Sequence, residues 1–245
     1  MNTFWLKIHA PFAAFRGFQA GVYRSTAPVM PPAAAYGLVL NLAGIEMRDY
    51  SNPKTTEILK DLPTLRLAIG VFRQPEKSST YQQLHSYPVG NSGKELAALT
   101  KGAKFWITPV RREMLVDYVG VIGVQTDNAT LQEKVEKGLC GEIEREYGLP
   151  FAGDNNFLFD KIEIFDNSET LMKSLEDESL SKKIIWYVQH QSDDKQVKGS
   201  CRLYVGINRT DNSKTTSSIF VPKEDLNLPL PENAWTWTPQ KTIHS

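Results

Sequence analysis

The stretch of sequence that decides the fold reads YRSTAPVMPPAAAYGLVLNLAG and spans residues 23–44. A loop forms its first half, and an almost wholly apolar segment forms its second half. The Pro31-Pro32 pair fits the start of a helix, because the first turn of a helix needs no N–H donor. The apolar residues from Ala33 to Leu42 then predict a short helix that ends at Gly44. Because Asn41 is nearly its only polar residue, we expect this helix to be buried against a sheet.

The segments around this helix predict four strands and a second helix. Side chains at residues 3–9 and 64–72 alternate as in strands with one buried face. Asn128 fits the N-cap of a helix whose apolar residues recur at four-residue spacing. We expect strands at residues 3–9, 64–72, 104–124 and 157–165, and this second helix at residues 129–147. The order strand, helix, strand, strand, helix, strand is that of a ferredoxin-like (RRM-like) α+β fold.

One face of the first strand carries Trp5, Lys7 and His9. In a ferredoxin-like sheet one face packs on helices, and aromatic and cationic side chains on the other face suit RNA. Alternatively, Trp5 and His9 face a second layer of protein. We favour the second layer, because large aromatic side chains are more often buried than exposed.

Residues 73–103 differ in composition from the segments on either side. Gln, Ser, Tyr, Lys, Gly and Asn dominate there, and the periodicity is weak. A long polar insertion inside a compact domain is usually functional or disordered. We therefore interpret residues 73–103 as an arm inserted into a domain of residues 1–165, and as a candidate element for handling RNA.

Residues 166–245 predict a β-rich C-terminal extension. A short charged helix is expected first, and strands follow, at residues 169–180, 184–190, 200–208 and 217–221 respectively. The last part is rich in proline and carries Trp235 and Trp237. These two side chains suit either an exposed interface or packing in a core.

The charges of the chain cancel overall but are unevenly distributed. Lys and Arg number 28, and Asp and Glu also number 28, so the formal net charge is zero, which is unusual for a nucleic-acid binder. No acidic residue precedes Glu46, basic residues prevail from Pro63 to Leu115, and acidic residues gather from Asp127 to Asp194. Such polarity can present a basic face to phosphates, although chance also produces segregation of this size.

The number and spacing of the cysteines and histidines indicate the redox compartment and the kinds of site that the chain can form. Cys140 and Cys201 are too few for a disulfide framework, so we expect a reduced, cytoplasmic setting. We expect neither export nor a membrane span, because no apolar run is long enough. The histidines and cysteines show none of the spacings of metal sites, and no phosphate-binding loop or nucleophile motif occurs. We therefore expect no metal and no cofactor.

Three segments carry a resemblance to a known family. In the first, residues 23–44, Pro-Pro precedes three small residues, an aromatic residue, Gly and Leu, and Leu-Ala-Gly closes the stretch. The second is residues 107–118, where Arg111 and Arg112 stand at a strand start, and the third is YGLPFAGDNNF at residues 147–157. In this order they resemble the Cas five family of the RAMP superfamily, which caps the 5′ end of the guide RNA in type I CRISPR surveillance (Cascade) complexes.

The resemblance implies an RNA-binding subunit without catalytic activity, in antiviral defence or RNA-guided DNA targeting. It implies binding of the repeat-derived 5′ handle of the guide RNA, beside a repeated backbone subunit and a large subunit, with target DNA met through the complex. Arginine forks suit phosphates, and glycines let a backbone approach closely. The predicted RNA-binding residues are Arg16, Tyr23, Arg24, Ser25, Arg73, Lys77, His85, Lys101, Lys104, Arg111, Arg112 and Asn155.

The chain departs from the family pattern in two places. The family usually has a basic residue after the glycine of the third segment, whereas this chain has Asp154. Consecutive strand residues point in opposite directions, so we expect one of Arg111 and Arg112 to contact RNA, without choosing which. The branch of the family that cleaves guide precursors uses a Tyr with a Lys-His pair, and no Lys-His dipeptide occurs here.

Two alternative functions remain open. A metal-independent endoribonuclease that processes guide precursors would need a general base, for which His85, between Tyr81 and Tyr87, is the candidate. A ferredoxin-like interaction module without RNA contact is the other alternative.

Overall fold

The computed structural model describes residues 1–17, 23–51, 57–88, 105–145, 148–177, 183–190, 197–208, 211–224 and 226–239. Its elements in chain order are β1 (Asn2–Ala13), β2 (Tyr23–Arg24), α1 (Pro32–Leu42), β3 (Arg48–Asp49), β4 (Glu57–Ile58), β5 (Leu65–Val71), β6 (Glu76–Pro88), β7 (Phe105–Thr126), α3 (Leu131–Leu139), β8 (Lys161–Phe165), α4 (Ser168–Asp177), β9 (Ile185–Gln189), β10 (Cys201–Gly206), η2 (Asn212–Lys214), β11 (Thr216–Lys223), η3 (Glu232–Ala234) and β12 (Thr236–Thr238).

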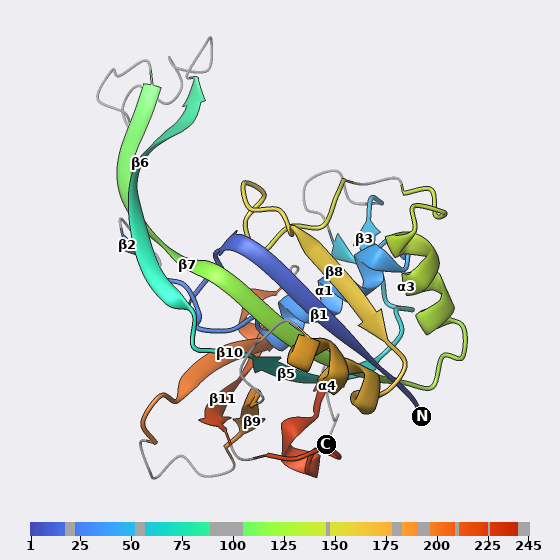
Figure 1. The fold of residues 1–245 in the computed structure, drawn as a ribbon. Helices are drawn as coiled ribbons and strands as arrows, with labels where there is room; N and C mark the ends of the chain where they lie inside the picture. The colour runs from blue at the N-terminus through green and yellow to red at the C-terminus, as the bar shows by residue number, and fades with distance from the viewer. Residues whose placement is uncertain are drawn as a thin grey trace.

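One large sheet organises the described part of the chain (Figure 1). The strand order across it is β10-β11-β9-β5-β7-β1-β8, with β12 also paired to β5, and with β2 and β6 also paired to β7. The pairings are antiparallel, except that β2 runs parallel to β7. The chain therefore has a mixed α/β fold with a large, mainly antiparallel sheet. Because β9 and β12 pair with β5, the C-terminal strands continue this sheet; the division into residues 1–165 and 166–245 stays a prediction.

Helix α1 forms where the sequence predicts it. Pro31 stands at its N-cap in an extended conformation, and Pro32 begins the helix. Gly44, just beyond its end, has a positive φ of 68°. Leu40 is wholly buried, and α1 packs against β5, β10 and α3. The predicted buried helix at residues 33–42 is confirmed.

A second layer of protein covers the opposite face of the sheet. Trp5 on β1 is 4% exposed, and its ring centroid lies 5.7 Å from those of Trp186 and Trp235. Helix α4 adds Leu171 to this cluster. The second-layer alternative is therefore correct for Trp5. Trp235 is a core residue, whereas Trp237 is 43% exposed.

Strands β6 and β7 form a long hairpin that projects from the body of the molecule (Figure 1). The sequence indicated a polar arm of weak periodicity at residues 73–103, but residues 76–88 form a regular strand paired with β7. The periodicity is weak because the side chains of residues 76–82 are exposed or half-buried, so neither face requires apolar residues. Residues 89–104 lie outside the described part.

Two elements are shorter than the sequence predicts. The helix expected at residues 129–147 is α3, and it is followed by Gly141 with a φ of 76°. The strand expected at residues 157–165 is β8, which begins only at Lys161 because the residues before it form a loop. In that loop the Ala152 N–H donates to the carbonyl oxygen of Phe157 at 2.7 Å.

The crossing of α1 and α3 depends on Gly138, where an added Cβ would collide with the carbonyl oxygen of Leu42. We expect Gly138→Ala to lower the free energy of unfolding by about 3 kcal/mol, because the clash forces the two helices apart. Gly37→Ala on α1 is the matched control, since a Cβ there meets nothing within 4 Å and alanine favours a helix over glycine by about 1 kcal/mol. Urea denaturation of both variants measures the difference, and equal stabilities would contradict the prediction.

Candidate nucleic-acid interface

Three strands meet at the base of the β6–β7 hairpin and bring predicted site residues together. Strand β2 places Tyr23 opposite Arg111 and Arg24 opposite Arg112 on β7. On the other edge of β7, β6 places Tyr81 opposite Arg111. Residues in register on neighbouring strands project from the same face. Tyr23, Arg111 and Tyr81 therefore form one row across the three strands, which we call the Tyr–Arg–Tyr row.

The Tyr–Arg–Tyr row is open to solvent. Tyr23 is 41% exposed and Tyr81 is 71% exposed, and Arg111 is also exposed. Arg111 donates through Nε to Ser79 Oγ at 3.0 Å, and its terminal nitrogens provide further donors. The row thus combines two aromatic surfaces suited to stacking with a planar cation suited to binding an anion.

Glu113 fixes the chain around β2 beside this row. Its Oε1 accepts a hydrogen bond from Tyr23 Oη at 2.5 Å, and its Oε2 accepts one from the Thr26 N–H at 3.0 Å. Lys77 Nζ lies 3.7 Å from Oε2. Burial alone raises the pKa of Glu113, but the hydrogen bonds from Tyr23 and Thr26 and the nearby Lys77 outweigh burial and lower this pKa. The hydrogen bond to Glu113 also raises the pKa of Tyr23.

Arg112 follows Arg111 on β7, points to the opposite face and is engaged in an ion pair. Its guanidinium contacts the carboxylate of Asp154, and the two side chains are 17% and 10% exposed. Asp154 also accepts hydrogen bonds from the backbone N–H and the side-chain amide of Asn156, at 3.0 and 2.9 Å. Arg112 therefore holds the loop of residues 148–157 against β7, and Arg111 is the exposed member of the pair.

The loop of residues 148–157 packs against the chain that follows β1. Gly153 has a positive φ of 82°, and an added Cβ would collide with the carbonyl oxygen of Ala14. The Ala14 N–H donates to the carbonyl oxygen of Ala152 at 3.0 Å. The sequence indicated that this glycine lets the backbone approach a phosphate, but the backbone that it approaches belongs to the protein itself. Asn155 is exposed on this loop.

The remaining predicted site residues fall in different places. Four of them lie near the row at the base of the hairpin, namely Arg16, Arg24, Ser25 and Lys77. Arg73 is not among them, because it lies on the sheet face beside Asp117. His85 belongs to β6, where it pairs with Ile107, and its side chain is not described. Lys101 and Lys104 lie outside the described residues.

A polar cluster that the sequence did not predict lies on the face of β1 and β7. His9 Nε2 lies 3.1 Å from Asp117 Oδ1, and His9 Nδ1 lies 3.7 Å from Asp160 Oδ2. Arg73 contacts the other oxygen of Asp117, and His9, Arg73 and Asp117 line a cavity of about 180 Å³. Asp117 has a φ of 50°, a left-handed conformation that is costly for a residue other than glycine. The alternation of β1 placed His9 on this face, but no local signal identifies Asp117 as its partner.

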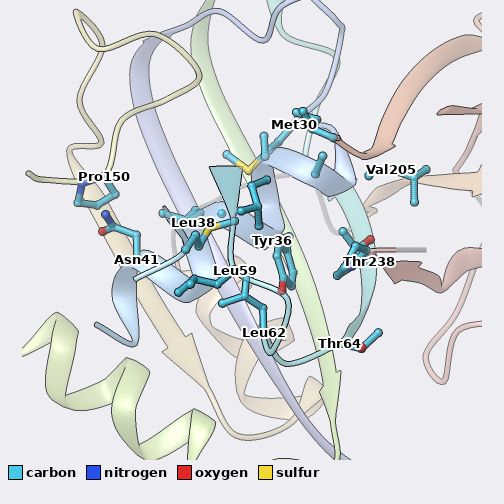
Figure 2. Close-up of a pocket in the computed structure, with 18 of the residues that line it drawn as sticks. Met30, Tyr36, Leu38, Asn41, Leu59, Leu62, Thr64, Pro150, Val205 and Thr238 are labelled. Atoms are coloured by element: carbon cyan, nitrogen blue, oxygen red, sulfur yellow. The ribbon is translucent and has the colours of Figure 1, made fainter. Parts of the chain in front are cut away.

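A groove along α1 is the second concave feature (Figure 2). Its volume is about 640 Å³, and its lining is mostly apolar. In Figure 2, Asn41 and Pro150 lie at one end of the groove, and Val205 and Thr238 lie at the other. We call it the α1 groove. No sequence pattern predicted it, because its walls come from segments that are far apart in the chain.

Within the residues that the structure describes, no group of three or more His, Cys, Asp and Glu side chains could hold a metal ion. Neither cysteine is in a disulfide. Burial raises the pKa of the Cys201 thiol to about 12, so this thiol is packed rather than reactive. In the same described part, no helix is long and apolar enough to cross a membrane.

The chain is similar to known proteins in sequence and in fold. The family model described as CRISPR-associated protein (Cas_Cas5) matches residues 3–144, more than half of the chain. A solved chain described as "CRISPR RNA-guided surveillance complex" aligns with a TM-score of 0.57 at 13% identity, over 91% of this chain and 90% of that chain. Another, described as "Crystal structure of Cas protein", aligns with a TM-score of 0.47 at 11% identity, over 95% of this chain and 96% of that chain. No curated protein matches significantly.

The lowered pKa of Glu113 predicts a pH-dependent contribution to stability. Because this pKa is below its ordinary value of 4.5 in the folded chain, the stabilisation is fully present above pH 4.5 and is lost as the pH falls through the lowered pKa. We expect Glu113→Gln to reduce the free energy of unfolding by about 1–2 kcal/mol at pH 7 and by less at pH 3. Glu76→Gln, at an exposed position of the same hairpin, should have no effect. Denaturation between pH 3 and 7 measures both, and a pH-independent effect at Glu113 would contradict the argument.

Proposed function

The chain belongs to the Cas5 family of CRISPR-associated proteins, and on that premise we propose that it binds and caps the 5′ handle of the guide RNA in a type I surveillance complex. The family identification made from residues 23–44 and two further segments is thus correct. The observation that carries the proposed function is the exposed Tyr–Arg–Tyr row at the base of the hairpin. We further propose that the chain is a non-catalytic subunit that acts in antiviral defence or RNA-guided DNA targeting.

The Tyr–Arg–Tyr row has the chemistry that an unpaired RNA end requires. Single-stranded RNA is recognised by stacking of its bases on aromatic side chains and by contacts to its phosphates. Tyr23 and Tyr81 supply the aromatic surfaces, and Arg111 between them supplies a planar cation. Stacking tolerates every base, so the row supports binding of a 5′ handle with modest dependence on its sequence.

Local charge supports the same proposal although the chain has no net charge. Arg16 is exposed, Arg24 on β2 is half-buried, and Lys77 on β6 is 47% exposed. The hairpin has the acidic residues Glu76 and Glu113, and Glu113 lies beside Lys77. Other acidic residues, such as Glu133 and Glu169, lie on α3 and α4. A basic region of this kind attracts phosphates independently of the total charge.

The connectivity of the central strands supports the finer fold proposal. Along the chain the order is β1, α1, β5, β7, α3 and β8, and across the sheet these strands lie in the order β5-β7-β1-β8. The alternation of strands and helices agrees with a ferredoxin-like core. We therefore propose a RAMP domain of this type, with the hairpin inserted between its second and third strands.

The proposed function also implies partners. One structure with the same fold is a chain of a CRISPR RNA-guided surveillance complex, which supports assembly of this chain with other proteins. We propose a backbone subunit repeated along the guide and a large subunit as its neighbours, with target DNA reached through the complex. The proposed setting is the cytoplasm.

One observation favours a second candidate function, metal-independent cleavage of guide precursor RNA. A histidine held by a carboxylate, as His9 is by Asp117, is the arrangement of a general base, and a nearby cation can stabilise developing negative charge. Arg73 is the nearby cation, but it already contacts Asp117, which reduces what it can offer a phosphate. We therefore retain the non-catalytic function as the proposal.

Substitutions in the Tyr–Arg–Tyr row test RNA binding. We expect Arg111→Ala to weaken binding of a labelled 5′-handle RNA by about tenfold or more, because a hydrogen bond to a charged group contributes about 1.5–3 kcal/mol. The slope of log affinity against log salt should become shallower by about 0.7 for each phosphate that Arg111 neutralises. Tyr81→Ala should cost about 1–3 kcal/mol of stacking without changing that slope. Fluorescence anisotropy across a salt series measures each effect.

Arg202→Ala is the matched control, because Arg202 is exposed on β10 at the far edge of the sheet. It should bind RNA with unchanged affinity and unchanged salt slope. If Arg111→Ala bound the handle as tightly as Arg202→Ala does, the Tyr–Arg–Tyr row would not be the RNA-binding surface.

An incubation with labelled repeat RNA in EDTA separates the two candidate functions. We expect the RNA to remain intact over a range from pH 6 to pH 8. A product that disappears in His9→Ala and persists in His190→Ala would instead establish cleavage at the His9–Asp117 pair. Gel electrophoresis of the labelled RNA is the measurement.

A further inference from the structure

Helix α1 lines one side of the α1 groove with small residues and with the larger Tyr36, Leu38 and Asn41, and we call this side the floor of the groove. Ala33, Ala34 and Gly37 line it, and a Cβ added at Gly37 would meet nothing within 4 Å. Helices pack with their axes about 8–10 Å apart, and small side chains at the contact allow the closer distances. From Ala33 to Asn41 the floor extends for about 12 Å, which is about two turns of helix.

Large apolar side chains from three separate segments stand at the rim of the α1 groove. Leu59, Phe151 and Ile207 line it and are 40%, 49% and 48% exposed. A small ligand inside the groove would leave the outer parts of these side chains in water. A partner protein would cover the groove and the rim together, as is typical of exposed apolar patches at protein interfaces.

Two polar atoms of residues in the lining lack a hydrogen-bond partner in the described part of the chain. They are Oδ1 of Asn41 and Oγ1 of Thr238, and Thr238 is only 1% exposed. Buried polar atoms are normally paired, and an unpaired one costs free energy. Asn41 and Thr238 lie at opposite ends of the groove (Figure 2). Because both atoms are buried, an occupant would reach them only when the Asn41 and Thr238 side chains rotate into the groove.

We propose that the α1 groove is the docking site for an amphipathic helix of a partner protein. The proposal rests on the proposed function in one respect, namely that the chain works in a complex with other proteins. The occupant would place apolar side chains at positions i, i+3 or i+4, and i+7 against the floor. An acidic residue of the occupant would face Lys60, the charged residue among the described residues that line the groove.

A helix fits the groove better than an extended peptide does. Extended peptides bind by adding a strand to a sheet edge, where main-chain hydrogen bonds hold them. The floor of the α1 groove is a helix, whose backbone donors and acceptors are engaged within the helix itself. Such a floor offers apolar contacts and lets the axis of a second helix come close, and helices pack together in this way.

One loop links the α1 groove to the base of the hairpin, on the face of β7 opposite the Tyr–Arg–Tyr row. Phe151 and Gly153 line the groove, and the next residue, Asp154, holds Arg112 on β7. A helix docked in the groove would therefore rest against the loop that is anchored at the base of the hairpin. This link to the base of the hairpin favours a partner that belongs to the same complex as the RNA.

The test uses the complex purified from cells that express the chain together with the products of its neighbouring genes. A photoreactive benzoylphenylalanine replaces Phe151, and mass spectrometry identifies the crosslinked peptides. We expect crosslinks to one other protein, in a segment whose apolar residues recur at three- and four-residue spacing. Gly37→Leu fills the groove from its floor and should lower the crosslink yield about tenfold, the effect of 1.4 kcal/mol on an equilibrium.

Control variants separate the α1 groove from RNA binding. Lys134→Leu adds the same side chain to the exposed face of α3 and should leave the yield unchanged. Gly37→Leu should bind handle RNA normally, whereas Arg111→Ala should lose RNA affinity and keep the crosslink. Thermal unfolding verifies that each variant is folded, and Leu59→Ser at the rim replaces Gly37→Leu if the latter does not fold.

Several outcomes would overturn the helix-docking proposal while leaving RNA binding intact. They are crosslinks only to RNA, crosslinks to a second copy of this chain, an absence of protein crosslinks, and a yield that neither Gly37→Leu nor Leu59→Ser lowers. A crosslinked segment without helical spacing of its apolar residues would also count against it.

Discussion

The hydrogen-bonded ladder of β7 is the interaction on which the rest of the structure depends. Its C-terminal half pairs with β1 and β5 inside the body, and its N-terminal half pairs with β6 and β2 in the hairpin. Because side chains alternate along a strand, this one register decides which residues enter the core and which face solvent. A shift of the β7 register by one residue would place Arg112 on the exposed face in place of Arg111. Arg111 would then no longer lie in a row with Tyr23 and Tyr81.

The sequence predicts well the elements that bury an apolar face. The sequence predicted the bounds of helix α1 and strand β5 to within one or two residues. Their apolar residues recur with the period of the element because those side chains pack in the core. Strand β6 has no such pattern, since it is stabilised by its pairing with β7 and not by a buried face. Predictions fail for elements that depend on a distant partner, because local periodicity carries no record of that partner.

The same limit applies to the candidate interface. The sequence identified Arg111 and Arg112 together, but the ion pair with Asp154 that distinguishes them joins residues 42 positions apart. Asp154 stood out in the sequence only as a departure from the family pattern, whereas in the structure this carboxylate orders the loop of residues 148–157. Glu113 acts similarly toward Tyr23. Acidic residues near the hairpin therefore organise its cations and aromatic side chains.

Asp117 gives the hairpin a mechanical property. It is the one residue of β7 with a left-handed backbone in the described part of the chain, and its carboxylate contacts His9 and Arg73, which lie outside the hairpin. The Asp117 carboxylate is thus one of several contacts that hold the base of the hairpin, together with the Arg112–Asp154 ion pair and the hydrogen bonds of Glu113. At about 3.3 Å per residue, the part of β7 from Phe105 to Asp117 spans about 40 Å. A rotation of the hairpin by about 5° at Asp117 would therefore move its far end by about 3–4 Å. The stiffness of these contacts at the base therefore sets how precisely the far end of the hairpin is positioned.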